Sequence, residues 1–151
     1  MGIYSGHKAQ LLEGGVRVPA FIRWPGKIKA NSSTQQVAIT MDWTATILAI
    51  AGAAPHPDFP LDGQNLLEIC TGKKQTFERT LYWRTFQVGN QKAMRDGNWK
   101  YLKTGQGEFL YDLAVDPSEK IDLKEKSPQM FEKLKSKYSE WEKTVLQPIP
   151  L

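Results

Sequence analysis

Two short runs joined by a turn decide the fold, and they lie at residues 91–103 with the sequence QKAMRDGNWKYLK. Short β-type runs flank Asp96-Gly97-Asn98, and such a glycine-containing turn between two runs is a strong β-hairpin signal. Similar segments lie outward on both sides, at residues 80–86 and 108–113. Because consecutive strands usually pair, the pattern predicts a four-stranded antiparallel meander.

A long helix is predicted after these strands. Ser127 and Pro128 are typical of an N-cap followed by proline at the first helical position. An apolar stripe at helical spacing then runs from Met130 to Val145, which would cover one face of the sheet. The predicted fold class is therefore α+β, a four-stranded antiparallel sheet packed by a long C-terminal helix.

The first half of the chain has a different pattern. The continuous apolar run at residues 16–23 predicts a strand buried on both faces, which is typical of α/β cores, with Pro19 at an edge or bulge. A helix is predicted from an N-cap at Asp42 to Gly52, followed by a short helix that ends at Gly72. The polar residues 73–76 predict a subdomain boundary.

The first of these helices is expected to bury one face. Trp43, Ile47, Ile50 and Ala51 recur at helical spacing and would form that apolar face.

Composition excludes several classes of protein. The chain has 151 residues, of which 40% are hydrophobic and 24% charged, with a net charge of +4. These values are typical of a globular protein and are too mildly basic to indicate nucleic-acid binding. No apolar run approaches the roughly 20 residues of a membrane span. Cys70 is the only cysteine, so an internal disulfide and a cysteine-rich zinc site are excluded.

The most specific motif is GHKAQLLEGGVRVP at residues 6–19, followed by a Trp-Pro-Gly turn. Lys8 and Glu13 flank a short turn, and the Gly14-Gly15 pair is expected to let the backbone turn sharply. This motif resembles the pattern Gly-x-Lys-x-x-x-x-Glu-Gly-Gly-x-Arg-x-Pro of the formylglycine-dependent sulfatases, the arylsulfatase type of the alkaline phosphatase superfamily.

The resemblance covers nearly the whole chain in the expected order. Further similar stretches are residues 42–52, 61–67, 81–84, 91–102 and 110–119. The resemblance implies that residues 1–72 are the C-terminal end of the α/β catalytic domain, a remnant with a strand and helices. Residues 73–151 would be the family's C-terminal subdomain, with its antiparallel sheet and helix.

The resemblance also suggests site residues. Lys8 would be the catalytic lysine that contacts the sulfate group, and a compact ammonium suits that role. His7 is a hypothetical substrate-binding residue beside it, although an exposed histidine without a role explains it equally well. Arg84 could bind an anionic substrate, whereas the simpler interpretation is a structural strand residue. Glu13 and Arg17 are interpreted as structural support.

The chain lacks other parts of the family's site. The nucleophile motif Cys/Ser-x-Pro-x-Arg does not occur, and the aspartates do not have metal-loop spacing. We therefore predict no metal ligands and no cofactor in this chain, whereas a complete enzyme would need calcium and a formylglycine. The isolated chain is predicted to be inactive.

The predicted function is thus the C-terminal fragment of a sulfatase that hydrolyses sulfate esters. The resemblance implies a periplasmic, secreted or lysosomal enzyme. A fragment of a related phosphoesterase is one alternative. Another is a structural module, or a polyanion-binding module that uses the basic and aromatic strand residues Arg84, Arg95, Trp99, Lys100, Tyr101 and Lys103. No membrane partner is expected, nucleic acid is disfavoured, and self-association through an exposed N-terminal segment is a further expectation.

Overall fold

The computed structural model describes residues 2–86 and 89–146. The chain forms two compact units: Met1–Pro19 together with Arg79–Leu151, which we call the sheet unit, and Ala20–Glu78, which we call the middle unit. None of the helices in the described ranges is long and apolar enough to cross a lipid bilayer.

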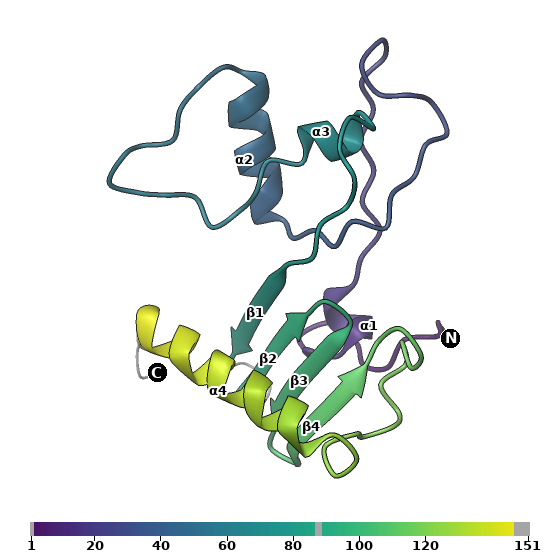
Figure 1. Cartoon of the computed structure of the whole chain (residues 1–151), viewed down its shortest axis with the longest axis vertical. Helices are drawn as coiled ribbons and strands as arrows, with labels where there is room; N and C mark the ends of the chain where they lie inside the picture. The colour runs from purple at the N-terminus through teal and green to yellow at the C-terminus, as the bar shows by residue number, and fades with distance from the viewer. Residues whose placement is uncertain (1, 87–88, 147–151) are drawn as a thin grey trace. The chain divides into compact units, whose positions relative to one another are not determined.

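The sheet unit contains the predicted meander (Figure 1). Its strands are β1 (Thr80–Thr85), β2 (Gln91–Asp96), β3 (Trp99–Thr104) and β4 (Gly107–Asp112), each antiparallel to the next. Gly97 begins the β2–β3 turn with a φ of 57°, a conformation that glycine adopts without strain. The predicted hairpin at residues 91–103 is confirmed.

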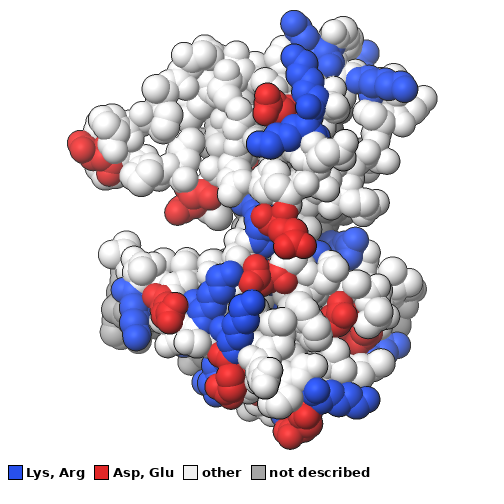
Figure 2. All heavy atoms as spheres, in the orientation of Figure 1, with Lys and Arg blue, Asp and Glu red and all other residues white. Residues whose placement is uncertain are grey.

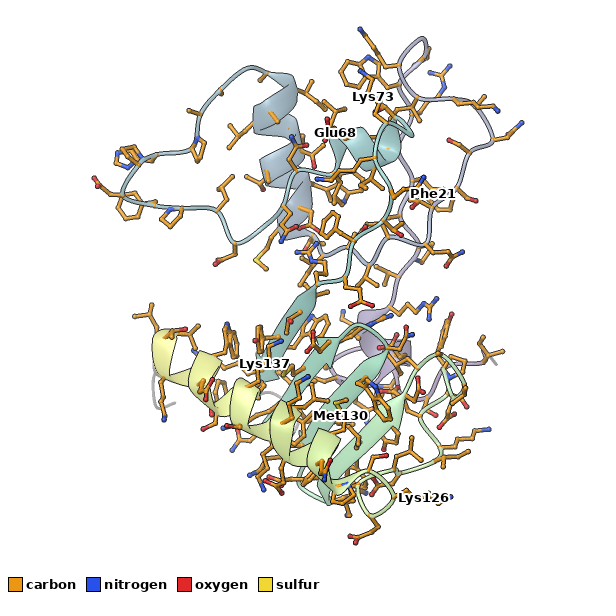
Figure 3. All side chains as sticks on the ribbon, in the orientation of Figure 1. Phe21, Glu68, Lys73, Lys126, Met130 and Lys137 are labelled. Carbon is orange, nitrogen blue, oxygen red and sulfur yellow. The ribbon has the colours of Figure 1, made fainter. Side chains whose placement is uncertain are left out.

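Helix α4 (Pro128–Thr144) covers one face of this sheet. Met94, Tyr101 and Leu110 from three strands pack there against Leu134 and Tyr138 of the helix. Figure 3 shows Met130 and Lys137 on the same side of the helix, facing the strands. Pro128 follows the N-cap Ser127 as predicted, although the Ser127 side chain makes no capping hydrogen bond.

The opposite face of the sheet is covered by the N-terminal segment. Leu11, just before the single-turn helix α1 (Glu13–Val16), packs against Ala93, Leu102 and Tyr111. These strand residues alternate with those under α4, as the pleat of a β-sheet requires. Both faces of the sheet are thus buried within one unit.

The middle unit contains α2 (Met41–Ile50) and α3 (Leu67–Cys70). Glycines at φ 66° and 72° follow them, which confirms the predicted ends at Gly52 and Gly72. The predicted N-cap is wrong, because Thr40 occupies the cap and Asp42 lies inside the first turn. The Asp42 carboxylate is fully buried and accepts backbone hydrogen bonds from Ile39 and Gln64.

The predicted apolar face of α2 is not the buried one. Ile47 is 61% and Ile50 is 39% exposed, whereas Ala45 and Thr46 are buried. Helical spacing identified a continuous apolar face, but no described element of the middle unit covers it. The Thr46 hydroxyl instead joins α2 to the next segment, because it accepts a hydrogen bond from the Leu66 backbone.

The strand predicted at residues 16–23 does not form. Val16 ends α1, and residues 17–24 have no regular structure. The segment is not paired with any strand that the structure describes, and an unpaired segment cannot satisfy its backbone groups as a strand does. Its Phe21 side chain is 90% exposed, and Figure 3 shows it extending from this segment.

Candidate functional site

Lys8 occupies the corner of a tight turn. The Gln10 backbone N–H donates to the His7 carbonyl at 3.0 Å, and Ala9 between them has a φ of 74°. That φ is unfavourable for any residue with a Cβ, so the turn is strained. The Lys8 side chain is exposed. The loop therefore presents an ammonium group on a defined backbone corner.

His7 and Arg84 have different surroundings. His7 is exposed beside Lys8, and its Nδ1 lies 3.0 Å from the Lys8 carbonyl oxygen. Arg84 lies on β1, on the face that α4 covers, and donates to the Leu146 carbonyl. Among the described residues, no hydrogen bond or ion pair joins Arg84 to Lys8 or His7. The substrate-binding roles of His7 and Arg84 therefore remain predictions.

The Gly14-Gly15 pair does not form the predicted sharp turn but allows two backbone segments to pack closely. Gly14 and Gly15 lie within α1, and neither has a positive φ. A Cβ at Gly15 would lie 2.0 Å from the Gln10 carbonyl oxygen, and one at Gly14 would lie 2.5 Å from the Ser5 oxygen. Both glycines are required because the backbone of the lysine loop lies directly against them.

A buried ion cluster lies beneath this loop; it comprises Glu13, Lys100, Glu119 and Arg95. Lys100 Nζ lies 2.9 Å from Glu13 Oε1 and 2.8 Å from Glu119 Oε1. The Lys100 side chain is 0% exposed. A lysine is almost never buried completely unless it is paired, and here two carboxylates compensate its charge.

The rest of the cluster balances these charges. Arg95 Nη1 approaches Glu13 Oε2 at 3.8 Å, and Arg17 approaches the same oxygen from the surface at 3.9 Å. Burial raises the pKa of Glu119 although Lys100 opposes that change, and burial lowers the pKa of Arg95. Glu119 Oε2 also accepts the Glu13 backbone N–H. Glu13 is thus fixed through both its side chain and its backbone.

The described side chains do not provide the cluster of oxygen ligands that calcium prefers. In the described ranges, no group of three or more histidine, cysteine, aspartate or glutamate side chains could hold a metal ion. Buried Asp42 is committed to backbone N–H groups. Burial raises the pKa of Cys70, which disfavours the reactive thiolate.

The polyanion-binding interpretation fails for two of its residues. Lys100 is 0% and Tyr101 only 3% exposed, so neither is available to a ligand. Burial and the nearby Glu108 carboxylate raise the pKa of Tyr101. Figure 2 shows basic and acidic side chains interspersed over the strands and α4 on the face drawn. This pattern does not form the continuous basic surface that a polyanion would need.

The role of Lys100 was missed from the sequence, although a signal was present. In the alternating strand β3, Lys100 shares its face with Leu102 and not with Trp99 or Tyr101. A lysine at a core position of a strand indicates a buried charge, and hence a carboxylate partner elsewhere in the chain.

The family described as N-sulphoglucosamine sulphohydrolase, C-terminal, matches residues 4–144. The chain belongs to this family. It is 30% identical over 150 residues to N-acetylgalactosamine-6-O-sulfatase of Bacteroides thetaiotaomicron, covering 89% of this chain and 29% of that protein. It is 39% identical over 111 residues to arylsulfatase G of Mus musculus, covering 71% of this chain and 21% of that protein.

Solved structures agree with this family assignment. A structure from work on the metabolism of multiple glycosaminoglycans by Bacteroides thetaiotaomicron has a TM-score of 0.82 at 30% identity, covering 96% of this chain and 33% of that chain. The crystal structure of Ps i-CgsB in complex with k-i-k-neocarrahexaose has a TM-score of 0.73 at 25% identity, covering 86% and 30%. The resemblance to sulfatases is confirmed, and the chain spans about a third or less of these proteins.

Proposed function

We propose that this chain is the C-terminal part of a sulfatase and that Lys8 binds the sulfate group of the substrate. The observation that carries the proposal is the exposed lysine at the corner of the His7–Gln10 turn, within a segment fixed to the sheet unit. Sulfate ester hydrolysis needs cationic donors at the sulfate oxygens and at the leaving oxygen, where charge develops. A lysine ammonium has three donors and can serve both.

His7 is the second residue that we place near the substrate. Its Nδ1 is 3.0 Å from the Lys8 carbonyl oxygen, a hydrogen bond when Nδ1 carries the proton. In a neutral ring this leaves Nε2 as an acceptor, and a protonated ring would offer Nε2–H to an anion. A sulfate ester of a glycosaminoglycan would be a suitable substrate class, since relatives of this chain include an N-acetylgalactosamine-6-O-sulfatase.

The nucleophile and the calcium ligands would come from a preceding part of the enzyme. In that enzyme we expect residues 1–72 to complete the α/β catalytic domain and residues 73–151 to form the C-terminal subdomain. The exposed apolar side chains of the middle unit, such as Phe21 at 90% and Ile47 at 61%, fit burial against that preceding part. The isolated chain would then be inactive and would tend to associate with itself.

The first test is to read the DNA upstream of the codon for Met1. We expect the reading frame to continue into a Cys/Ser-x-Pro-x-Arg motif. A stop codon without that motif would overturn the proposal.

Lys8→Ala in the complete enzyme is the second test. Loss of one transition-state donor should lower kcat/KM for a sulfate ester by roughly 10²- to 10³-fold. Lys120→Ala is the matched control, because Lys120 is also an exposed lysine of the sheet unit. Equal activity of the two variants would remove Lys8 from the site. Assaying a phosphonate monoester in parallel separates the sulfatase from a phosphoesterase.

A further inference from the structure

We propose that Lys100 and Glu119 are positioning residues that hold the Lys8 loop in its active geometry through Glu13. This inference rests on the proposed function of Lys8. Residues of the C-terminal strands and of the segment after them would then help to fix the position of Lys8, although they lie far from it in sequence. Neither residue contacts the substrate in this proposal, because both side chains are fully buried.

The lysine loop is closed on itself by backbone hydrogen bonds. The Gly14 backbone N–H donates to the Ser5 carbonyl at 2.7 Å, and Gln10 donates to His7 at 3.0 Å. The absent side chains of Gly14 and Gly15 let these backbones touch. A displacement of α1 must therefore move the turn that carries Lys8.

The loop is also fixed to the rest of the sheet unit at defined points. The Leu11 backbone N–H donates to Gln91 Oε1 at 2.9 Å, and the Ser5 hydroxyl donates to the Ser118 carbonyl. The Glu13 N–H donates to Glu119 Oε2. These partners come from β2 and from the segment after β4.

Lys100 is the centre of this attachment. It contacts both carboxylates within 2.9 Å, so it joins α1 to the Glu119 segment. Without it, Glu13 and Glu119 would be two buried carboxylates, and the more distant Arg95 and Arg17 approach Glu13 at 3.8 and 3.9 Å. An uncompensated buried charge is strongly unfavourable, and the loop can relieve it by moving into water.

The experiment compares Lys100→Met with Lys103→Met in the full 151-residue chain. Both variants remove one lysine from β3, but the Lys103 side chain is 46% exposed and pairs with Glu108 at 3.2 Å. Amide hydrogen exchange is measured by NMR, together with the backbone ¹⁵N order of Lys8. In Lys100→Met we expect exchange at Leu11, Glu13 and Gly14 at least tenfold faster and Lys8 less ordered, with strand amides changed less than threefold. Lys103→Met should leave the loop unchanged.

The outcomes decide the inference. An unchanged loop in Lys100→Met would overturn it, and so would equal acceleration at every strand amide, because Lys100 would then support only the fold. If Lys100→Met does not fold, Glu119→Gln decides, with an expected three- to tenfold acceleration at Glu13. Adding Glu119→Gln to Lys100→Met should restore part of the protection, because it removes one unpaired carboxylate.

A turnover assay links the loop to the proposed reaction. In the complete enzyme, assayed well below the melting temperature of each variant so that the protein stays folded, Lys100→Met should lower kcat at least tenfold, and Lys103→Met should not. If the loop becomes mobile in Lys100→Met but kcat is unchanged, the inference is overturned. The proposed role of Lys8 would not be affected by that result. If instead Lys8→Ala has no effect on turnover, the proposed function fails although the exchange result stands.

Discussion

The sheet unit and the middle unit differ in whether their apolar patterns are buried. In the sheet unit, both faces of the meander find partners, and even Lys100 is completely buried. In the middle unit, Phe21 is 90% and Ile47 is 61% exposed, although both belong to apolar patterns in the sequence. A hydrophobic pattern predicts that a surface should be buried, but burial requires that the partner belong to the same chain. The sheet unit therefore finds the partners for its apolar faces within this chain, whereas the middle unit does not find them for these side chains.

Two substitutions to alanine, one in each unit, should show the largest difference in stability between the units. Leu134 on α4 is 0% exposed, whereas Ile47 on α2 is 61% exposed. We expect Leu134→Ala to lower the free energy of unfolding of the sheet unit by about 2–5 kcal/mol, because it leaves a cavity. Ile47→Ala should change the stability of the middle unit by less than about 0.5 kcal/mol.

Urea titrations followed through the NMR signals of each unit measure both values. A cost for Ile47→Ala close to that for Leu134→Ala would show that the apolar face of α2 is buried in solution. The distinction between the two units would then be wrong. Leu146→Ala is a further control, because Leu146 follows α4 but is 89% exposed.

The elements that sequence predicted well are those whose partners are local. The meander and α4 follow from short β-type runs, turn glycines and one apolar stripe, and the four strands and the helix that covers one face of their sheet all lie between residues 80 and 144. The strand at residues 16–23 was wrong because composition reports apolar character and not whether a neighbouring strand exists. The same reason explains the exposed Ile47 on a correctly predicted helix.

The site was predictable only in part. The motif predicts Lys8 as a site residue, and its role stays a prediction. The ion cluster was not predictable, since Glu13 contacts Lys100 across 87 positions and Glu119 across 106 positions. Local patterns cannot specify which distant carboxylate neutralises a buried lysine. The close packing of Gly15 on Gln10 is likewise a tertiary contact.

The strained turn of the lysine loop gives a smaller test of the sheet unit. Ala9 has a φ of 74°, which costs roughly 1–2 kcal/mol in a residue with a Cβ. Ala9→Gly removes this strain but loosens the unfolded chain, so we expect a net gain of about 0.5–1 kcal/mol. Urea unfolding of the sheet unit measures it.

Ala114→Gly is the matched control, because Ala114 is exposed and has no positive φ. It should reduce stability by a few tenths of a kcal/mol. A loss in Ala9→Gly of the same size as in the control would show that the turn at Lys8 is not strained in solution.

The smallest effect should come from the ion pairs that attach α4. Asp96 accepts hydrogen bonds from Lys137 Nζ at 2.9 Å and from the Thr80 hydroxyl at 2.8 Å. Burial opposes the charged carboxylate, but these two donors outweigh it and hold the pKa of Asp96 below its ordinary value. A lowered pKa means that the folded state binds the proton less readily than the unfolded state. The pair therefore stabilises the sheet unit above the unfolded pKa of roughly 4, and this contribution is lost as the pH falls through the folded pKa.

Asp96→Asn tests this contribution of the helix attachment. Because the Asp96 side chain is 28% and the Lys137 side chain 38% exposed, solvent screens the pair and the loss at pH 7 should be only a few tenths of a kcal/mol. The variant and the parent chain should approach each other in stability as the pH falls below about 4, and they should converge only below the folded pKa of Asp96. Glu125→Gln is the control, since Glu125 is an exposed carboxylate of the same unit. If both variants have the same pH dependence, the Asp96–Lys137 pair does not contribute to the attachment of α4 to the sheet.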